Sequence, residues 1–207
     1  MKNIGVFGGS FDPVHIGHLH IARDAAACGK LDELLFMPSN IQPFKQDSKV
    51  APAEDRLVML RESMSFMQNT PQACRFDVTD VEISSGGVSY TAISLSKLRK
   101  EYGTGYKFWF ILGADMFQSI EKWYLHEEIL SEYGLIVMIR HGTGEDEIEA
   151  NAEVCSEKYG TEYILCKNNL YDFSSSRIRE NVRNGRSIEA MVAPMVEKYI
   201  IEKGLYQ

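Results

Sequence analysis

Apolar residues in this chain fall into two alternating patterns: short unbroken runs, and longer stretches in which they recur every three or four positions. The unbroken runs predict strands that are buried on both faces, as in a parallel sheet. These runs are residues 4–7, 34–37, 107–112, 135–139 and 163–166. Residues 76–83 alternate between apolar and polar positions instead, which predicts an edge strand with one wet face.

Helices are predicted between these strands. Residues 52–67 carry an apolar stripe at Leu57, Leu60, Met64 and Met67, and spacings of three and four residues indicate a helix that turns this stripe to the core. A second helix is predicted from residue 15 or 16 to about 28, with Gly29 as its C-cap, and a third from an N-cap at Thr91 to residue 102. The remaining predicted helices cover residues 147–159, the stretch from the serines at 174–176 to Gly185, and residues 193–203.

This alternation predicts parallel β-α-β units, and therefore an α/β fold with a Rossmann-like, doubly wound, mostly parallel sheet flanked by helices. No internal repeat, low-complexity tract or linker divides the sequence. We expect residues 1–207 to form a single domain, with a small C-terminal helical portion over roughly residues 173–207. The loops that follow the first strand and residue 112, and the loop before residue 179, should then line one cleft.

Composition narrows the class of protein. The 207 residues are 44% hydrophobic and 25% charged, with a net charge of −7, which argues against a general nucleic-acid binder. No apolar run approaches the ~20 residues that span a membrane, and the N-terminus lacks a signal-peptide pattern. We therefore expect a cytoplasmic protein with neither nucleic acid nor membrane as partner. The four scattered cysteines predict buried, reduced thiols, and the oligomeric state, including a homo-oligomer, stays open.

The first strand leads directly into candidate chemistry. Gly8 and Gly9 allow main-chain N–H groups to approach a ligand closely, and a helix N-terminus follows with His15 and His18 on one face. Free N–H groups and the helix dipole both favour an anion there, so a phosphate-rich ligand is expected. Two alternatives are open: the histidines cap the helix, or they bind zinc, for which no third ligand stands nearby.

Three other positions each have a functional and a structural interpretation. Asp115 follows the strand at 107–112 and suits a ribose in an open sheet, or it is a helix N-cap. Trp123 stacks on a flat ring or packs in the core. The serines at 174–176 and Arg179 form a second anion site, or a serine-rich N-cap with solvated arginines.

Two motifs carry a family resemblance. Residues 9–18 match G-x-F-D-P-x-H-x-G-H at every fixed position, and residues 174–179 read Ser-Ser-Ser-Arg-Ile-Arg; together they resemble a nucleotidyltransferase superfamily. Neither a Walker A motif nor G-x-G-x-x-G occurs. The chain is similar over essentially its whole length to the bacterial nicotinate-nucleotide adenylyltransferase family. Its further marks are Ser89-Tyr90-Thr91, Gly113-Ala114-Asp115-Met116, Lys122-Trp123-Tyr124 and Gly204-Leu205-Tyr206.

The resemblance implies that ATP and nicotinate mononucleotide give deamido-NAD and pyrophosphate in NAD biosynthesis. It implies catalytic roles for His15, His18 and Arg179. ATP would be bound by Gly8, Gly9, Ser10, Phe11, Gly113, Asp115, Ser175, Ser176 and Ile178. Nicotinate mononucleotide would be bound by Lys45, Tyr90, Thr91 and Trp123. Mg²⁺ is expected as cofactor, held by the ATP phosphates and not by protein side chains, with imidazolium and guanidinium groups stabilising the developing charge.

One position departs from the family pattern. Phe44 stands where the family's early loop usually has a histidine, although Lys45 is kept. Other functions are open: the same transfer to nicotinamide mononucleotide or phosphopantetheine, or a catalytically silent nucleotide-binding module. An RNA-binding Rossmann-like domain conflicts with the acidic charge.

Overall fold

A computed structural model describes residues 1–43, 50–68, 74–140, 144–168 and 173–207. Lys45 and Phe44 lie outside the described residues. The sheet consists of β1 (Lys2–Gly9), β2 (Glu33–Pro38), β3 (Arg75–Val78), β4 (Tyr106–Gly113), β5 (Gly134–Arg140) and β6 (Tyr163–Asn168). The helices are α1 (Ile16–Cys28), α2 (Ala53–Gln68), α3 (Val81–Ser85), α4 (Thr91–Tyr102), α5 (Ala114–Phe117), α6 (His126–Glu132), α7 (Glu145–Tyr159), α8 (Ser175–Arg183) and α9 (Pro194–Lys203), with a 3-10 turn, η1 (Ile120–Lys122).

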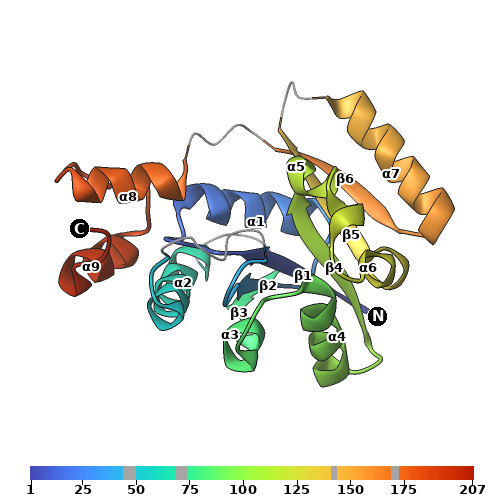
Figure 1. Ribbon diagram of the computed structural model, residues 1–207, viewed down its shortest axis with the longest axis horizontal. Coiled ribbons are helices and arrows are strands. Elements are labelled where there is room, and N and C mark those ends of the chain that lie inside the picture. Colours follow the sequence, from blue (N-terminus) through green and yellow to red (C-terminus); the bar gives the residue numbers. More distant parts are fainter. Residues whose placement is uncertain (44–49, 69–73, 141–143, 169–172) are drawn as a thin grey trace.

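The sheet has six strands in the order β3-β2-β1-β4-β5-β6, and every neighbouring pair is parallel. The predicted Rossmann-like α/β fold is therefore confirmed. The chain builds outward from β1 to β3, returns to the centre, and continues from β4 to β6, so the strand order reverses between β1 and β4. Figure 1 shows α8 and α9 together at one end of the molecule, beyond the sheet.

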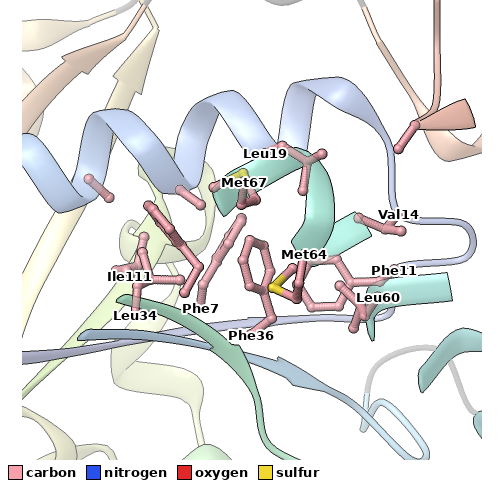
Figure 2. Close-up of a cluster of buried hydrophobic side chains, with 14 of the residues drawn as sticks. Phe7, Phe11, Val14, Leu19, Leu34, Phe36, Leu60, Met64, Met67 and Ile111 are labelled. Atoms are coloured by element: carbon pink, nitrogen blue, oxygen red, sulfur yellow. The ribbon is translucent and has the colours of Figure 1, made fainter. Parts of the chain in front are cut away.

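Helices cover both faces of the sheet, and successive side chains of each strand enter different cores. Phe7 packs in the core beneath α1, α2 and α9, whereas its neighbour Val6 packs in the core beneath α4, α6 and α7. Figure 2 shows part of the first core, where Phe7 and Phe36 from the sheet meet Met64 and Met67 of α2 below α1. The predicted stripe on residues 52–67 is confirmed, because all four of its members are buried.

Several boundaries differ from the sequence prediction. The first strand continues through Gly8 and Gly9, which pair with β2, so the loop begins only at residue 10. The predicted strand at 76–83 is wrong in its second half. There the Val81 N–H donates to the Thr79 hydroxyl at 3.3 Å, a local turn that starts α3. The N-cap of α4 is Tyr90 and not Thr91.

The structure also bears on the predicted burial of the cysteines and on the search for a membrane-spanning helix. Cys155 and Cys166 are buried, but Cys28 is exposed and Cys74 half-buried, so the prediction of buried thiols holds only in part. In the described parts of the chain, no helix is both long and apolar enough to cross a membrane.

Candidate active site

The carboxyl ends of β1 and β4 lie side by side at the centre of the sheet, where the strand order reverses. In doubly wound sheets, ligands bind in the crevice at such a reversal. The loop of residues 10–15 starts at the end of β1, and α5 starts at the end of β4. The candidate site is therefore at this edge, where the sequence placed it.

His15 and His18 cap the start of α1 reciprocally. The His18 main-chain N–H donates to Nδ1 of His15 at 3.3 Å, and the His15 N–H donates to Nδ1 of His18 at 3.2 Å. Their rings stack with centroids 3.6 Å apart. Because each Nδ1 accepts a hydrogen bond, each neutral ring carries its proton on Nε2, and Nε2 is the atom that can donate to a ligand. The prediction that the histidines cap the helix is thus correct. The same capping bonds leave the Nε2–H groups free to donate to a phosphate, as the functional interpretation requires.

The residue immediately before His18, Gly17, must be small. A Cβ at Gly17 would lie 3.0 Å from Nδ1 of His15 and 3.3 Å from Cβ of Phe173. Such contacts would force the His15 ring or the loop before α8 to move. The glycine of the His-x-Gly-His sequence is therefore required by the packing around His15.

Both rings lie in a poorly solvated environment. Burial lowers the pKa of His15 to about 4. Burial, and then the proximity of His15, lowers the pKa of His18 well below its ordinary value. In the ligand-free protein, burial therefore favours neutral rings that donate through N–H over the expected imidazolium groups. Positive potential at this edge comes instead from the α1 N-terminus and from nearby guanidinium groups.

The second motif docks against the first. Ser175 Oγ donates to the carbonyl of Pro13 at 2.9 Å, and Nη1 of Arg179 donates to the carbonyl of Asp12 at 2.7 Å. Nη2 of Arg179 contacts Oγ of Ser176 at 3.3 Å, while Ser174 caps α8. The Arg179 guanidinium thus contacts the loop that leads into the two histidines, although it is 167 positions from Asp12 in the sequence.

Asp115 lies at the other side of this edge. Gly113, the last residue of β4, is the N-cap of α5, so the N-cap interpretation of Asp115 is wrong. The Asp115 side chain is exposed and folds back over Gly113, where an added Cβ would lie 2.6 Å from Oδ1. Gly113 therefore makes room for the exposed carboxylate, which is where the sequence places a ribose.

Hydrogen bonds connect the same edge to Tyr90 and Thr91, two of the proposed acceptor-binding residues. The Ser39 N–H donates to the Gly9 carbonyl at 2.9 Å, and the Asn40 N–H donates to Oγ of Ser89 at 2.9 Å. Ser89 precedes Tyr90 and Thr91, which begin α4. This chain connects the end of β1 to the start of α4.

The aromatic residues near the start of α4 are only partly buried. Trp123 is half-buried and meets Phe110 of β4 edge-on, with centroids 6.0 Å apart. Tyr124 is exposed and lies against the ring of Tyr90 at 4.7 Å. Trp123 thus packs partly against the core, and part of its ring stays accessible.

Two of the predicted ATP-binding residues turn their side chains inward. Phe11 is 1% exposed and packs between Phe7, Phe36 and His18, and Ile178 is fully buried in the same core. Gly8, Gly9 and Ser10 are half-buried at the end of β1.

Sequence reasoning missed the buried polar groups that support the loop. Asp12 is 2% exposed, and its Oδ1 accepts hydrogen bonds from the Ala51 N–H at 3.0 Å and the Tyr206 hydroxyl at 2.8 Å. Arg56 is 1% exposed and donates to the carbonyls of Ser10 and Ala51. The position of Arg56 on the inner, apolar face of α2 is a signal that could have identified it.

A buried carboxylate was also missed near the start of α4. Glu82 is 6% exposed and accepts a hydrogen bond from the Ser94 hydroxyl at 2.6 Å. Burial raises its pKa, against the lowering effect of Ser94 and Ser89. Glu82 thereby joins α3 to the segment that contains Tyr90.

Metal ligands are scarce at this edge. The described ranges contain no group of three or more His, Cys, Asp or Glu side chains that could hold a metal ion. Asp115 is a single exposed carboxylate, and Oδ2 of Asp12 faces Arg179 at 3.4 Å. A cation here would need most of its ligands from bound phosphates.

Known proteins resemble this chain over most of its length. Residues 6–181 match the family model described as cytidylyltransferase-like. The chain is 33% identical over 207 residues to a probable nicotinate-nucleotide adenylyltransferase of Halalkalibacterium halodurans, covering 100% of this chain and 92% of the relative. It is 36% identical over 204 residues to a protein of the same name from Caldicellulosiruptor bescii, covering 99% and 98%.

A solved structure shares the fold. The Plasmodium falciparum nicotinic acid mononucleotide adenylyltransferase complexed with NaAD superimposes with a TM-score of 0.77 at 22% identity. The superposition covers 100% of this chain and 98% of that one.

Proposed function

This chain belongs to the cytidylyltransferase-like family, among the nicotinate-nucleotide adenylyltransferases, and we propose that it transfers the adenylyl group of ATP to nicotinate mononucleotide. The products are deamido-NAD and pyrophosphate, and the reaction is a step of NAD biosynthesis. The observation that carries this proposal is the meeting of the two motifs on the loop after β1. The Arg179 and Ser175 side chains are bonded to residues 12 and 13, next to the stacked histidines.

We assign the triphosphate to this meeting point. Nε2 of His15 and His18, the N-terminus of α1 and the remaining N–H groups of Arg179 would bind its phosphates, with Ser175 and Ser176 at the start of α8. The main chain of residues 8–11 and 178 would line the nucleotide, and Asp115 above Gly113 would accept from the ribose hydroxyls.

The acceptor would bind at the start of α4 and beside Trp123. The first N–H groups of a helix lack intrahelical partners, and the Tyr90 side chain makes no capping bond to them. These groups and the positive end of the helix favour the carboxylate of nicotinate over an uncharged amide. The half-buried Trp123 offers a flat surface to the pyridine ring. Lys45 stays a proposed contact.

The chemistry needs positioning rather than a protein nucleophile. The 5′-phosphate oxygen of the mononucleotide attacks the α-phosphorus of ATP, the bond to the β-phosphate breaks, and pyrophosphate leaves with the electron pair. This phosphate is already ionised at neutral pH, so no general base is required. We propose that Mg²⁺ enters with ATP, bound mainly by its phosphates, and neutralises charge on the leaving group.

A product assay by mass tests this function. Purified protein is incubated with ATP, Mg²⁺ and either nicotinate mononucleotide, nicotinamide mononucleotide or phosphopantetheine, and pyrophosphate is measured in parallel. We expect deamido-NAD from the acid, and pyrophosphate only when an acceptor is present. A clear preference for another acceptor would change the substrate assigned to this protein. Absence of any product would favour a silent nucleotide-binding module.

A further inference from the structure

We infer that Tyr206 is a positioning residue for Arg179, acting through the buried carboxylate of Asp12. This inference rests on the proposed function only in taking Arg179 as a phosphate ligand. Tyr206 is separated from Asp12 by 194 positions in the sequence, yet its hydroxyl lies 2.8 Å from Oδ1 of Asp12.

The Asp12 carboxylate is held in an unequal way. Oδ1 accepts from the Tyr206 hydroxyl and from the Ala51 N–H at 3.0 Å. Oδ2 is buried and makes no hydrogen bond within the described structure, although Nη1 of Arg179 is only 3.4 Å away. Nη1 donates instead to the Asp12 main-chain carbonyl at 2.7 Å. The two hydrogen bonds on Oδ1 thus hold the carboxylate in an orientation in which Oδ2 makes no hydrogen bond to the Arg179 guanidinium.

This restraint preserves Arg179 for a ligand. Planar carboxylates bind arginine by a bidentate pair when they are free to turn. A carboxylate released from Tyr206 would turn Oδ2 toward Nη1 and draw Arg179 into the protein. Arg56, which is 1% exposed, also lies beside Asp12, so the carboxylate stands between two guanidinium groups and leaves an excess of positive charge at the loop.

The turn after α9 brings the Tyr206 hydroxyl to Asp12. Gly204 adopts a left-handed conformation with φ of 61°, and the Leu205 N–H donates back to the Ile200 carbonyl at 3.0 Å, which closes α9. Tyr206 itself has φ of 66°, a strained value for a non-glycine residue. Such a conformation persists only where the surrounding contacts impose it, and here the bond to Asp12 is one of those contacts.

Tyr206→Phe removes the hydroxyl and nothing else. We expect kcat/KM for ATP to fall about threefold to tenfold, the range for losing part of one charge-assisted hydrogen bond, with KM for the mononucleotide changed less than about twofold. Tyr199→Phe is the matched control. Its hydroxyl also donates to a carboxylate, Asp55 at 2.7 Å, but between α9 and α2 and away from Asp12. Tyr199→Phe should behave as the wild type.

A double-mutant cycle separates positioning from general structure. Binding of a non-hydrolysable ATP analogue is measured by calorimetry for wild type, Y206F, R179A and the double variant. The effect of Y206F should largely disappear in the R179A background. Persistence of the full effect there, or equal behaviour of Y206F and Y199F, would overturn the inference.

The analogue-induced rise in melting temperature is recorded for each variant as well. It compares each protein with itself, so it stays informative if Y206F lowers the basal stability. Wild-type protein without turnover on any acceptor would refute the proposed function, while the binding cycle would still decide the role of Tyr206.

Discussion

The two ends of the proposed site differ in how much of their geometry exists before a ligand binds. At the phosphate end, His15 and His18 cap one another, and Arg179 is bonded to the Asp12 carbonyl. At the acceptor end, Trp123 is half-buried and the Tyr90 side chain makes no capping bond. The phosphate end is preorganised, whereas the acceptor end depends on the incoming ligand to complete it.

This difference has an energetic meaning. Groups that act on developing charge are effective only if no reorganisation is needed at the moment of reaction. Groups that bind a flat ring contribute mainly contact area, and small adjustments there cost little. Changes at the phosphate end should therefore lower turnover, and changes at the acceptor end should weaken binding of one substrate.

His18→Ala is the most severe test of the phosphate end. It removes a preorganised Nε2 donor and the acceptor that holds the His15 N–H. We expect turnover to fall at least ~10²-fold, the scale for loss of one donor to transition-state charge. His20→Ala, two residues further along α1 and outside the proposed site, is the control and should stay within about threefold of wild type. Near-normal turnover of His18→Ala would remove the phosphate end from the mechanism.

The pH dependence of stability tests the burial of the same pair. The unfolded chain binds a proton at His15 with a pKa near 6.5, but the folded chain binds it only near 4. Unfolding therefore takes up a proton between these values, and the free energy of unfolding falls as the pH is lowered from 6.5 toward 4. His15 alone should contribute a loss of about 2 kcal/mol between pH 7 and pH 5.

Urea unfolding at the two pH values measures this loss. His15→Asn keeps a good N-cap residue but cannot titrate, so its stability should fall less than that of wild type over the same interval. Equal losses in the two proteins would show that His15 is not the group that titrates.

Sequence reasoning succeeded where the signal is local. Unbroken apolar runs predicted five strands, and the ten-residue motif located the start of α1 and the pair of histidines. Sequence reasoning failed where a side chain is positioned by residues far away in the sequence. Asp12 meets Tyr206 and Arg179 across 194 and 167 positions, and no periodicity or local spacing records such bonds. The end of β3 was missed because the apolar and polar positions continue to alternate roughly beyond Val78, whereas the Thr79 hydroxyl accepts from the Val81 N–H and starts a helical turn.

Gly17→Ala applies a smaller disturbance to the phosphate end. The added methyl group meets Nδ1 of His15 at 3.0 Å and must displace the ring or Phe173. We expect kcat/KM to fall about tenfold, because a small misplacement of a catalytic group costs one to two orders of magnitude. Gly105→Ala is the matched control, since nothing lies within 4 Å of its added Cβ, and it should be indistinguishable from wild type. A tolerant Gly17 would mean that the stacked pair adjusts freely.

Trp123→Ala tests the acceptor end and should have the smallest effect. The indole contacts Phe110 only edge-on, so its loss removes part of a binding surface rather than a buried core residue. We expect KM for the mononucleotide to rise about fivefold, equivalent to ~1 kcal/mol of aromatic contact, with KM for ATP and kcat nearly unchanged. Initial rates over a grid of both substrate concentrations separate these constants. An equal loss for both substrates would show that Trp123 supports the whole site, and the contrast between a preorganised and an adaptable end would then be wrong.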